Sequence, residues 1–403
     1  PHACLACAQA AGCSRSQCSS NVAEDERCCP QFGHCELQDV VNYVGIPAHT
    51  PRWIPHREPV LDSEPLIIRD YTLCIGCTRC VRACHDLRGV GALGWVWDSE
   101  GRVQVGSLAP SLAESGCRFC TACVEVCPTG AIIDKNLGQG EKKAMLVPCQ
   151  SACPAGIDVP EYVRLIAEHR PQAALAVLRQ SVPLPGVLGR VCAHPCEDVC
   201  RRGQVDQPVS ICLLKRFAAD NGGETWQQAL TKAPDSGRKV AIVGAGPAGL
   251  TAAFFLASKG HGVTVFEAED QPGGMLRYGI PAFRLPQDIL ESEINHIQSR
   301  GVDIRTNAKI ASLGDLQSQG YDAVFLAVGA QLSRSIPLEG GDQGHVIRGL
   351  DFLKALRRGQ NPPIGARVVV AGGGNVALDA ALSALRQGAQ LVEMVCLEKR
   401  AEM

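Results

Sequence analysis

The sequence predicts a multidomain chain in which small cysteine-rich domains precede an α/β nucleotide-binding region. Three observations support this fold class. All but two of the 22 cysteines lie before residue 201, two four-cysteine runs share one spacing, and strands alternate with helices from Lys239 onward. Such alternation is typical of a parallel sheet covered by helices. The predicted domains are a Cys-rich module at 1–48, a paired-cluster domain at 66–135, an α-helical domain at 145–230, a Rossmann-like domain at 238–345 and a truncated Rossmann-like domain at 346–403.

The composition excludes several classes of protein. A net charge of -2 and only 4% aromatic residues argue against a nucleic-acid partner and against binding to an anionic membrane surface. Neither a membrane-spanning apolar segment nor a secretory signal is visible, so we expect a cytoplasmic protein without a membrane partner. Cytoplasmic thiols stay reduced, so most of the cysteines should be metal ligands rather than disulfides.

The two four-cysteine runs carry the strongest functional signal. Each has the spacing C-x2-C-x2-C-x3-C, in which three thiolates wrap one [4Fe-4S] cluster and the fourth ligates the other. Structural zinc sites or disulfides do not need two identical four-cysteine registers. The spacing predicts a ferredoxin-like domain with two ligand sets, which are Cys74, Cys77, Cys80 and Cys127 for one cluster and Cys117, Cys120, Cys123 and Cys84 for the other.

The segment that follows is predicted to be helical. Asp158 is placed to cap a helix opened by Pro160, and Pro171 opens another helix through Leu178. Two cysteines farther along, Cys212 and Cys396, lie on apolar stretches and are expected in the core. The histidines His169 and His296 have polar helical contexts, so we expect both of them on the surface.

The first α/β unit contains a dinucleotide-binding motif between a strand and a helix. The glycines of G-x-G-x-x-G allow a tight turn, a close approach of backbone to pyrophosphate and close packing of helix on strand. The N-terminal amides of the helix then face the phosphates. An acid after the next strand, Val263–Phe266, is placed to accept hydrogen bonds from an adenosine ribose. The candidate residues are Gly244, Gly246, Pro247, Ala248, Gly249 and Glu267.

The same pattern recurs after a second strand that begins at Val368, so two dinucleotides are expected. Its candidate residues are Gly372, Gly374, Asn375 and Ala377, with alanine in the place of the third glycine. Between the two units, Gly273, Gly274 and Arg277 are expected near a flavin, with a simple turn as the alternative. Gly329 ends a strand from Tyr321 and would let backbone pass near the cofactor.

The end of the second unit bears on the choice of coenzyme. Glu398 and Arg400 follow the strand Leu391–Cys396. At this place an acid accepts the ribose 2′-OH of NAD and an arginine accommodates the 2′-phosphate of NADP. The sequence leans slightly to NAD. Because the chain starts without Met and stops just after this strand, we expect it to be part of a longer polypeptide.

Residues 149–403 resemble the small subunit of glutamate synthase and related NAD(P)H-oxidising flavoproteins. The resemblance rests on Cys149-Gln-Ser-Ala-Cys153-Pro154, on the segment Gly189–Cys200, on the motif from Gly244 to Glu267 and on Gly372–Asp379. It implies FAD in the first nucleotide site and NAD(P)H in the second, with the nicotinamide stacked on the flavin. It also implies iron–sulfur ligands among Cys149, Cys153, Cys192, Cys196 and Cys200, enough for one [4Fe-4S] cluster and a spare.

Residues 1 to about 135 resemble cluster domains of the large iron–sulfur subunit of complex I and of multimeric hydrogenases and formate dehydrogenases. Cys4, Cys7 and Cys13 match the cysteine spacing of a His-x3-Cys-x2-Cys-x5-Cys cluster site, whose histidine would fall before Pro1. Cys35 competes with Cys13 as the third ligand. Whether this module holds one cluster or two stays open, and the whole chain is expected to hold at least three clusters.

These features together predict an iron–sulfur flavoprotein subunit. It would exchange a hydride with NAD(P)H at FAD and pass single electrons through its clusters to another redox subunit or to ferredoxin, within a hetero-oligomeric complex. A flavin is the converter that this route needs, because nicotinamide moves two electrons together and each cluster accepts one. The alternatives are the electron-donating subunit of a glutamate synthase, a non-catalytic conduit in a hydrogenase or formate dehydrogenase complex, and a redox sensor.

Overall fold

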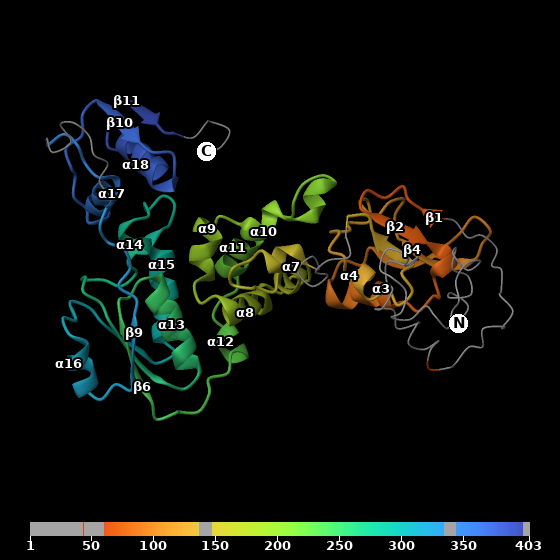
Figure 1. The fold of residues 1–403 in the computed structure, drawn as a ribbon, viewed down its shortest axis with the longest axis horizontal. Coiled ribbons are helices and arrows are strands. Elements are labelled where there is room, and N and C mark those ends of the chain that lie inside the picture. The colour runs from red at the N-terminus through yellow and green to blue at the C-terminus, as the bar shows by residue number, and fades with distance from the viewer. Residues whose placement is uncertain (1–42, 44–59, 137–146, 334–343, 398–403) are drawn as a thin grey trace, which may run out of the picture. The chain divides into compact units, whose positions relative to one another are not determined.

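The computed structural model describes residue 43 and residues 60–136, 147–333 and 344–397. Its contacts divide the chain into two compact units. The first contains the described residues up to Val177 together with Ala193–Leu214, and the second contains Leu178–Cys192 and the described residues from Lys215 onward. The segment 145–230, predicted from the sequence as one helical domain, therefore contributes to both units (Figure 1).

The described part of the first unit begins with a small antiparallel sheet, and both cysteine runs lie between its second and third strands in the sequence. Its strands are β1 (Val60–Leu61), β2 (Ile67–Asp70) and β5 (Ile132–Asp134), in the order β1-β2-β5. Two one-turn helices, α3 (Arg79–Arg82) and α4 (Ala122–Glu125), carry the runs, and a π-helix, Ala83–Leu87, extends α3. Between the runs lies a hairpin, β3 (Leu93–Trp97) and β4 (Val103–Ser107), which the sequence analysis did not predict.

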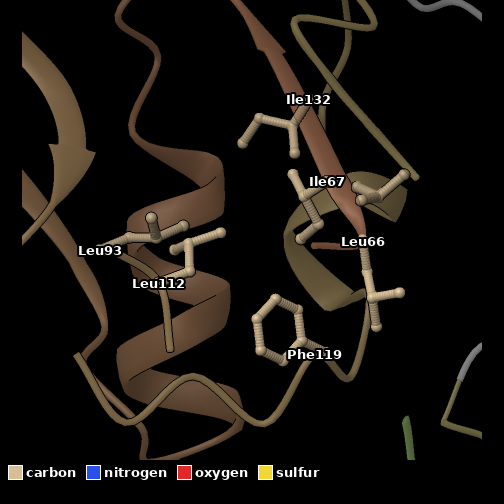
Figure 2. Packing of buried hydrophobic residues seen from close by; sticks show 7 residues of the cluster. Leu66, Ile67, Leu93, Leu112, Phe119 and Ile132 are labelled. Carbon is tan, nitrogen blue, oxygen red and sulfur yellow. The ribbon is translucent and has the colours of Figure 1, made fainter. Parts of the chain in front are cut away.

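The core of this region is small and apolar. It consists of Leu66, Ile67, Leu93, Leu112, Phe119, Val124 and Ile132. Figure 2 shows the side chains of the two paired strands, Ile67 and Ile132, directed toward the same interior as Phe119. Cys80, Cys84, Cys117 and Cys123 pack against this cluster. The hydrophobic core and the cysteine runs therefore share one interior.

Short helices follow, most of them opened by proline. They are α6 (Pro148–Ser151), α7 (Val159–Ala167), α8 (Pro171–Ser181), α9 (Pro185–Val191), α10 (Pro195–Asp198), α11 (Ile211–Asn221) and α12 (Trp226–Ala229). Proline suits the first turn because its missing N–H would have no helical partner there. The Asp158 carboxylate accepts from the Glu161 amide at 3.2 Å, which confirms the predicted cap of α7.

The second unit contains the predicted parallel sheet. Its four strands lie in the order β8-β7-β6-β9, and each adjacent pair is parallel. The strands are β6 (Lys239–Val243), β7 (Gly262–Phe266), β8 (Val302–Arg305) and β9 (Ala323–Leu326), and the helices between and around them are α13 (Pro247–Ser258), α14 (Met275–Tyr278), α15 (Gln287–Gln298) and α16 (Leu313–Ser318).

The second unit also contains a smaller α/β region. Its parallel strands are β10 (Arg367–Ala371) and β11 (Leu391–Val395), and its helices are α17 (Gly349–Arg357) and α18 (Asn375–Arg386). The two helices pack on each other around Phe352, Leu353, Ala380 and Ala384. In the part of the chain that the structure describes, we find no helix with the length and apolarity needed to span a bilayer.

Two expectations about single residues require correction. His296 is half-buried: its ring meets Trp226 edge to face at 5.5 Å, and its Nδ1 atom lies 3.1 Å from Arg179. The surface prediction was wrong for His296 because α12 covers that side of α15, whereas His169 is exposed as predicted. Cys212 is buried as predicted, but Cys396 is only half-buried because β11 alternates between exposed and partly buried residues.

Candidate iron–sulfur and dinucleotide sites

One cavity of the first unit is lined by cysteines of both runs. Cys74, Cys77, Cys80 and Cys127 line it together with the buried Arg69. Cys74 follows β2 and Cys127 precedes β5, and the pairing of Ile67 with Asp134 and of Arg69 with Ile132 holds these strands side by side. The antiparallel sheet therefore brings the last cysteine of the second run to the first three cysteines of the first run.

The remaining four cysteines line a second cavity. Cys84, Cys117, Cys120 and Cys123 surround it, with Leu93, Leu112 and Phe119 in its apolar wall. Among the described residues, no three or more His, Cys, Asp or Glu side chains lie close enough together to hold a single metal ion. The four cysteines of each set line a small cavity, and a [4Fe-4S] cluster would take one thiolate on each of its four iron atoms.

The two cysteine loops have the same backbone conformation. Gly76 (φ 64°) and Thr78 (φ 59°) in the first loop correspond to Phe119 (φ 52°) and Thr121 (φ 64°) in the second. A left-handed conformation costs a non-glycine residue about 1–2 kcal/mol, so three of these four positions are strained. The turn brings backbone N–H groups to sulfur, as in the bond from the Phe119 amide to the Cys117 Sγ atom at 3.3 Å. Hydrogen bonds to cluster sulfurs are one of the means by which proteins set cluster potentials.

Burial makes these thiols hard to ionise without iron. Burial, with a smaller contribution from charge on neighbouring cysteines, raises the pKa of Cys80 to about 11 and that of Cys117 to about 12. The pKa of Cys123 is raised well above its ordinary value for the same reasons. Since iron binds the thiolate, cluster assembly must offset this cost, and the donor set fits a positively charged iron–sulfur core.

A third group of cysteines lies next to the second cavity. Cys149 and Cys200 line a further cavity with Cys120 of the second run. Burial raises the pKa of Cys149 to about 12, with smaller contributions from the charges of Cys200, Cys196 and Cys120, which places these residues close together. Cys153 lies just after α6 and does not line this cavity, and Cys192 is the C-terminal cap of α9 in the second unit.

Two matching turns present Cys149 and Cys196. Each cysteine is the second residue of a one-turn helix, after a proline and a residue in the left-handed region, Val147 (φ 59°) or His194 (φ 45°). These two helices, α6 and α10, pack on each other. Positive φ is a genuine outlier for a β-branched residue such as Val147, and such strain tends to occur at functional sites. The pair of turns therefore supports a ligand site at this position.

Arginines next to the cavities were missed by the sequence analysis. Arg201 forms an ion pair with the buried Asp134, and the Arg202 Nη1 atom donates to the carbonyl oxygens of Cys117 at 2.6 Å and Ala113 at 3.2 Å. Both arginines follow Cys200 directly, so they tie that cysteine to the paired-cluster region. The basic pair immediately after the last cysteine of the motif was the signal that could have revealed them.

Three glycines shape the first nucleotide loop. A Cβ on Gly244, which has φ 107°, would lie 2.3 Å from the Ala327 oxygen, and one on Gly249 would lie 1.9 Å from the Gly244 oxygen. The loop carrying Gly274 comes equally close, since its Cβ would lie 2.8 Å from the Gly246 Cα atom. Two backbone loops thus meet at the carboxyl edge of the sheet, where Pro247 and Ala248 are the first residues of α13 and are exposed.

The polar candidates of this region differ in what they contact. Glu267 is buried at the end of β7, and its carboxylate accepts from the Ala245 amide at 2.7 Å and from the Glu269 amide at 2.9 Å. The guanidinium of Arg277 is also buried and donates to the Pro272 oxygen at 2.6 Å. Arg277 therefore holds the Gly273-Gly274 loop rather than extending into open space. Gly329 (φ 69°) follows β9 at the same edge of the sheet.

The second nucleotide loop is more open. A Cβ on Gly374 would meet no heavy atom within 4 Å, and one on Gly372 (φ 129°) would lie 3.5 Å from the Ala377 Cβ atom. Asn375 is the first residue of α18. The loop around Gly372 therefore has room for the Ala377 methyl group, unlike the first loop, where a methyl group on Gly249 would collide with backbone. The candidates Cys4, Cys7, Cys13, Cys35, Glu398 and Arg400 lie outside the described residues.

Three family models match consecutive parts of the chain. Residues 73–131 match the 4Fe-4S dicluster domain, residues 143–226 match the 4Fe-4S domain II of dihydropyrimidine dehydrogenase, and residues 238–402 match the pyridine nucleotide-disulphide oxidoreductases. These matches agree with the positions of the cysteine cavities and of the glycine loops.

Several proteins are similar to this chain over its larger part. The NADP(+)-dependent formate dehydrogenase subunit beta of Moorella thermoacetica is 45% identical over 65% of this chain and 41% of its own length. The NADPH-Fe(3+) oxidoreductase subunit beta of Geobacter sulfurreducens is 44% identical over 64% of this chain and 39% of its own. The NAD-dependent dihydropyrimidine dehydrogenase subunit PreT of Salmonella typhimurium is 38% identical over 63% of each chain.

The chain thus spans about two fifths of the first two of these relatives. All three have names that describe a nicotinamide-dependent oxidoreductase or one of its subunits. The chain thus has two regions similar to 4Fe-4S domains and one region similar to the pyridine nucleotide-disulphide oxidoreductases, which indicates [4Fe-4S] clusters, FAD and NAD(P)H as its cofactors.

Proposed function

We propose that this chain belongs to an electron-transfer subunit that oxidises NAD(P)H at FAD and passes the electrons through [4Fe-4S] clusters to a partner redox subunit or to ferredoxin. The observation that carries the proposal is the continuity of the cysteine cavities. Cys120 lines both the second cavity and the cavity of Cys149 and Cys200. Clusters held on either side of one cysteine would be close enough for direct electron transfer.

The cluster ligands follow from the cavities. The first cluster is assigned to Cys74, Cys77, Cys80 and Cys127 and the second to Cys84, Cys117, Cys120 and Cys123. The third is assigned to the group Cys149–Cys200, with Cys149, Cys196 and Cys200 as the ligands best supported by their proximity. The N-terminal module at 1–48, with Cys4, Cys7, Cys13 and Cys35, is proposed as a further cluster site on sequence alone.

In the α/β region, backbone groups would make most of the contacts to the dinucleotides. Gly244 and Gly246 let the chain approach a pyrophosphate, and the first amides of α13 stabilise its negative charge. Glu267 ends β7 with a carboxylate at the place where an adenosine ribose would donate hydrogen bonds. When bound, FAD accepts a hydride from NAD(P)H and releases the two electrons one at a time. The loop from Gly372 to Ala377 would hold the nicotinamide coenzyme.

A buried ion pair supports a rigid junction between the helical segment and the FAD-binding region. The Arg179 Nη2 atom donates to the Glu293 carboxylate at 2.9 Å, and the Gly186 amide donates to the same carboxylate at 3.2 Å. The side chains of Arg179 and Glu293 are only 2% and 6% exposed. The pair fixes the segment that leads to Cys192 onto α15 within the second unit.

The names of the relatives support a role within a larger complex, because two of them are beta subunits. We propose that the partner is another redox subunit or a ferredoxin, with neither nucleic acid nor membrane as partner and with a cytoplasmic location, as predicted from the sequence. The domain boundaries predicted from the sequence are retained as proposals.

The test is anaerobic reduction of the purified full-length protein by NADH and by NADPH. The proposal predicts bleaching of the flavin and iron–sulfur absorbance and the appearance of EPR signals from reduced clusters. A non-catalytic conduit would stay oxidised with both coenzymes while dithionite still reduced it. Iron analysis giving fewer than about eight irons per chain would contradict the assignment of the two ferredoxin-type clusters.

A further inference from the structure

One arginine lies at the boundary between two of the cysteine cavities. Arg118 lines the cavity of Cys117 and Cys120, and it also lines the cavity that contains Cys149 and Cys200. It comes from the second cysteine loop itself, where it stands between Cys117 and Cys120 in the sequence. Its guanidinium is thus positioned to act on the occupants of both cavities.

The charge of Arg118 is not neutralised by a carboxylate of the described residues. Its Nη1 atom donates a hydrogen bond to the Arg88 carbonyl oxygen at 3.4 Å. The neighbouring arginines differ, because Arg201 pairs with Asp134 and Arg202 pairs with Asp206. Arg88 lines only the cavity of Cys149 and not that of Cys117.

The fold of the loop does not require this arginine. The first cysteine loop has the same left-handed positions, yet it carries Ile75 where the second loop carries Arg118. Ile75 is 47% exposed and lines the first cysteine cavity with an uncharged side chain. Because an uncharged residue serves the same backbone turn, the role of Arg118 must lie in its charge or its contacts.

A fixed positive charge between two clusters favours their reduced states. Each cluster gains one negative charge on reduction, and a nearby guanidinium stabilises that charge, more strongly in a partly buried site than in water. It also weakens the repulsion between two neighbouring clusters that are both reduced. We propose that the charge of Arg118 assists electron transfer by raising the reduction potentials of the Cys84–Cys123 cluster and of the cluster at Cys149 and Cys200.

The step that Arg118 assists is a single electron transfer. One cluster loses an electron, the adjacent cluster gains it, and no bond forms or breaks and no proton is required. The inference rests on the cluster assignments of the proposed function. It does not depend on nicotinamide or flavin, so a titration with dithionite tests it independently of the NAD(P)H reaction.

The experiment is an EPR-monitored redox titration of the full-length protein with dithionite and mediators. In Arg118→Gln we expect the midpoint potentials of two clusters to shift to more negative values, while the potential of the Cys74–Cys80 cluster changes least. Arg118→Lys should keep potentials close to those of the wild type because it keeps the charge. Arg82→Gln is the matched control, since Arg82 lies two residues from both Cys80 and Cys84 in the sequence but is exposed.

Two results would overturn the proposal. Midpoint potentials in Arg118→Gln that move no more than those of Arg82→Gln would exclude an effect of the charge. A shift in Arg118→Lys as large as that in Arg118→Gln would assign the effect to packing instead. If Arg118→Gln loses iron, Arg118→Met provides a second uncharged variant of similar length, and iron content together with the absorbance spectrum selects the variant that is compared.

Discussion

The substitution Gly249→Ala tests the geometry of the first nucleotide loop. Gly249 is buried in the first turn of α13, and a Cβ there would lie 1.9 Å from the backbone oxygen of Gly244 and 3.2 Å from the Ile242 Cγ2 atom. An ordinary carbon–oxygen contact is about 3.3 Å, so helix and loop would have to separate by about 1.4 Å. Neither partner is a flexible side chain, and the amides that face the pyrophosphate would move with the helix.

The expected magnitude follows from opposing effects. Forcing a methyl group into a packed site costs about 3 kcal/mol, and replacing glycine by alanine in a helix returns up to about 1 kcal/mol. A net loss of about 2 kcal/mol corresponds to an approximately 30-fold weaker binding of FAD or to a comparable loss of stability. The assays are FAD titration of the deflavinated protein by fluorescence and thermal unfolding with and without FAD.

Two substitutions in the second loop serve as controls. Ala377→Gly removes the methyl group from the position equivalent to Gly249 and should cost only about 1 kcal/mol through helix propensity. Gly374→Ala adds a methyl group where no heavy atom lies within 4 Å, so the fold should tolerate it while the binding of NAD(P)H weakens. If Gly249→Ala binds FAD within about threefold of wild type, which is less than 1 kcal/mol, and unfolds at the same temperature, the close packing of α13 on this loop is refuted.

Three further changes have expected outcomes. Cys127→Ala should remove the cluster of Cys74 and leave the cluster of the other cavity in place, as judged by EPR and iron content, because Cys127 lines only the first of the two ferredoxin cavities. Glu398→Arg should raise the NADPH-to-NADH ratio of kcat/KM by about tenfold, because it replaces a charge that repels the 2′-phosphate. Arg179→Ala should lower the free energy of unfolding by about 3–5 kcal/mol, since it leaves the carboxylate of Glu293 buried without its cation.

Each of these changes has a matched control. Cys396→Ala should retain all iron, and loss confined to the Cys117 cluster in Cys127→Ala would reverse the ligand assignment. Glu393→Arg changes an exposed residue of β11 and should leave coenzyme preference unchanged; an unchanged ratio in Glu398→Arg as well would show that Glu398 does not face the ribose. Arg179→Lys keeps a cation beside Glu293 and should lose less stability, so a loss as large as that of Arg179→Ala would argue against the ion pair as the cause.

The pairing of strands illustrates what could be predicted and what could not. The alternation from Lys239 onward predicted the parallel sheet, and β6, β7, β9, β10 and β11 lie where strands were expected. The hairpin β3–β4 was missed. Its strands are short and two of their large side chains, Trp95 and Trp97, are 55% and 73% exposed, so no buried apolar face marked them in the sequence.

The candidate site shows the same division. Cysteine spacing is a local property, since a loop that wraps a cubane needs its thiolates at set intervals, and this is why the two runs and their exchanged fourth ligands could be predicted. Glycine spacing is only partly local, because Gly249 meets the Gly244 oxygen five residues earlier, whereas Gly244 itself meets Ala327 of a distant segment. The role of Arg277 was harder to predict, because its guanidinium holds its own loop and only the surrounding oxygens reveal this.

The sequence by itself determined the kinds of site in this protein: iron–sulfur ligands in the cysteine runs and nucleotide loops at the glycine motifs. Only the tertiary structure decided that Cys120 borders Cys149 and that Arg118 beside them has no carboxylate partner among the described residues. The physical reason is the distance along the chain over which each effect acts. Thiolate spacing acts along a few residues, whereas the neighbours of Arg118 and the partner of Arg201 come from segments that meet only when the chain folds.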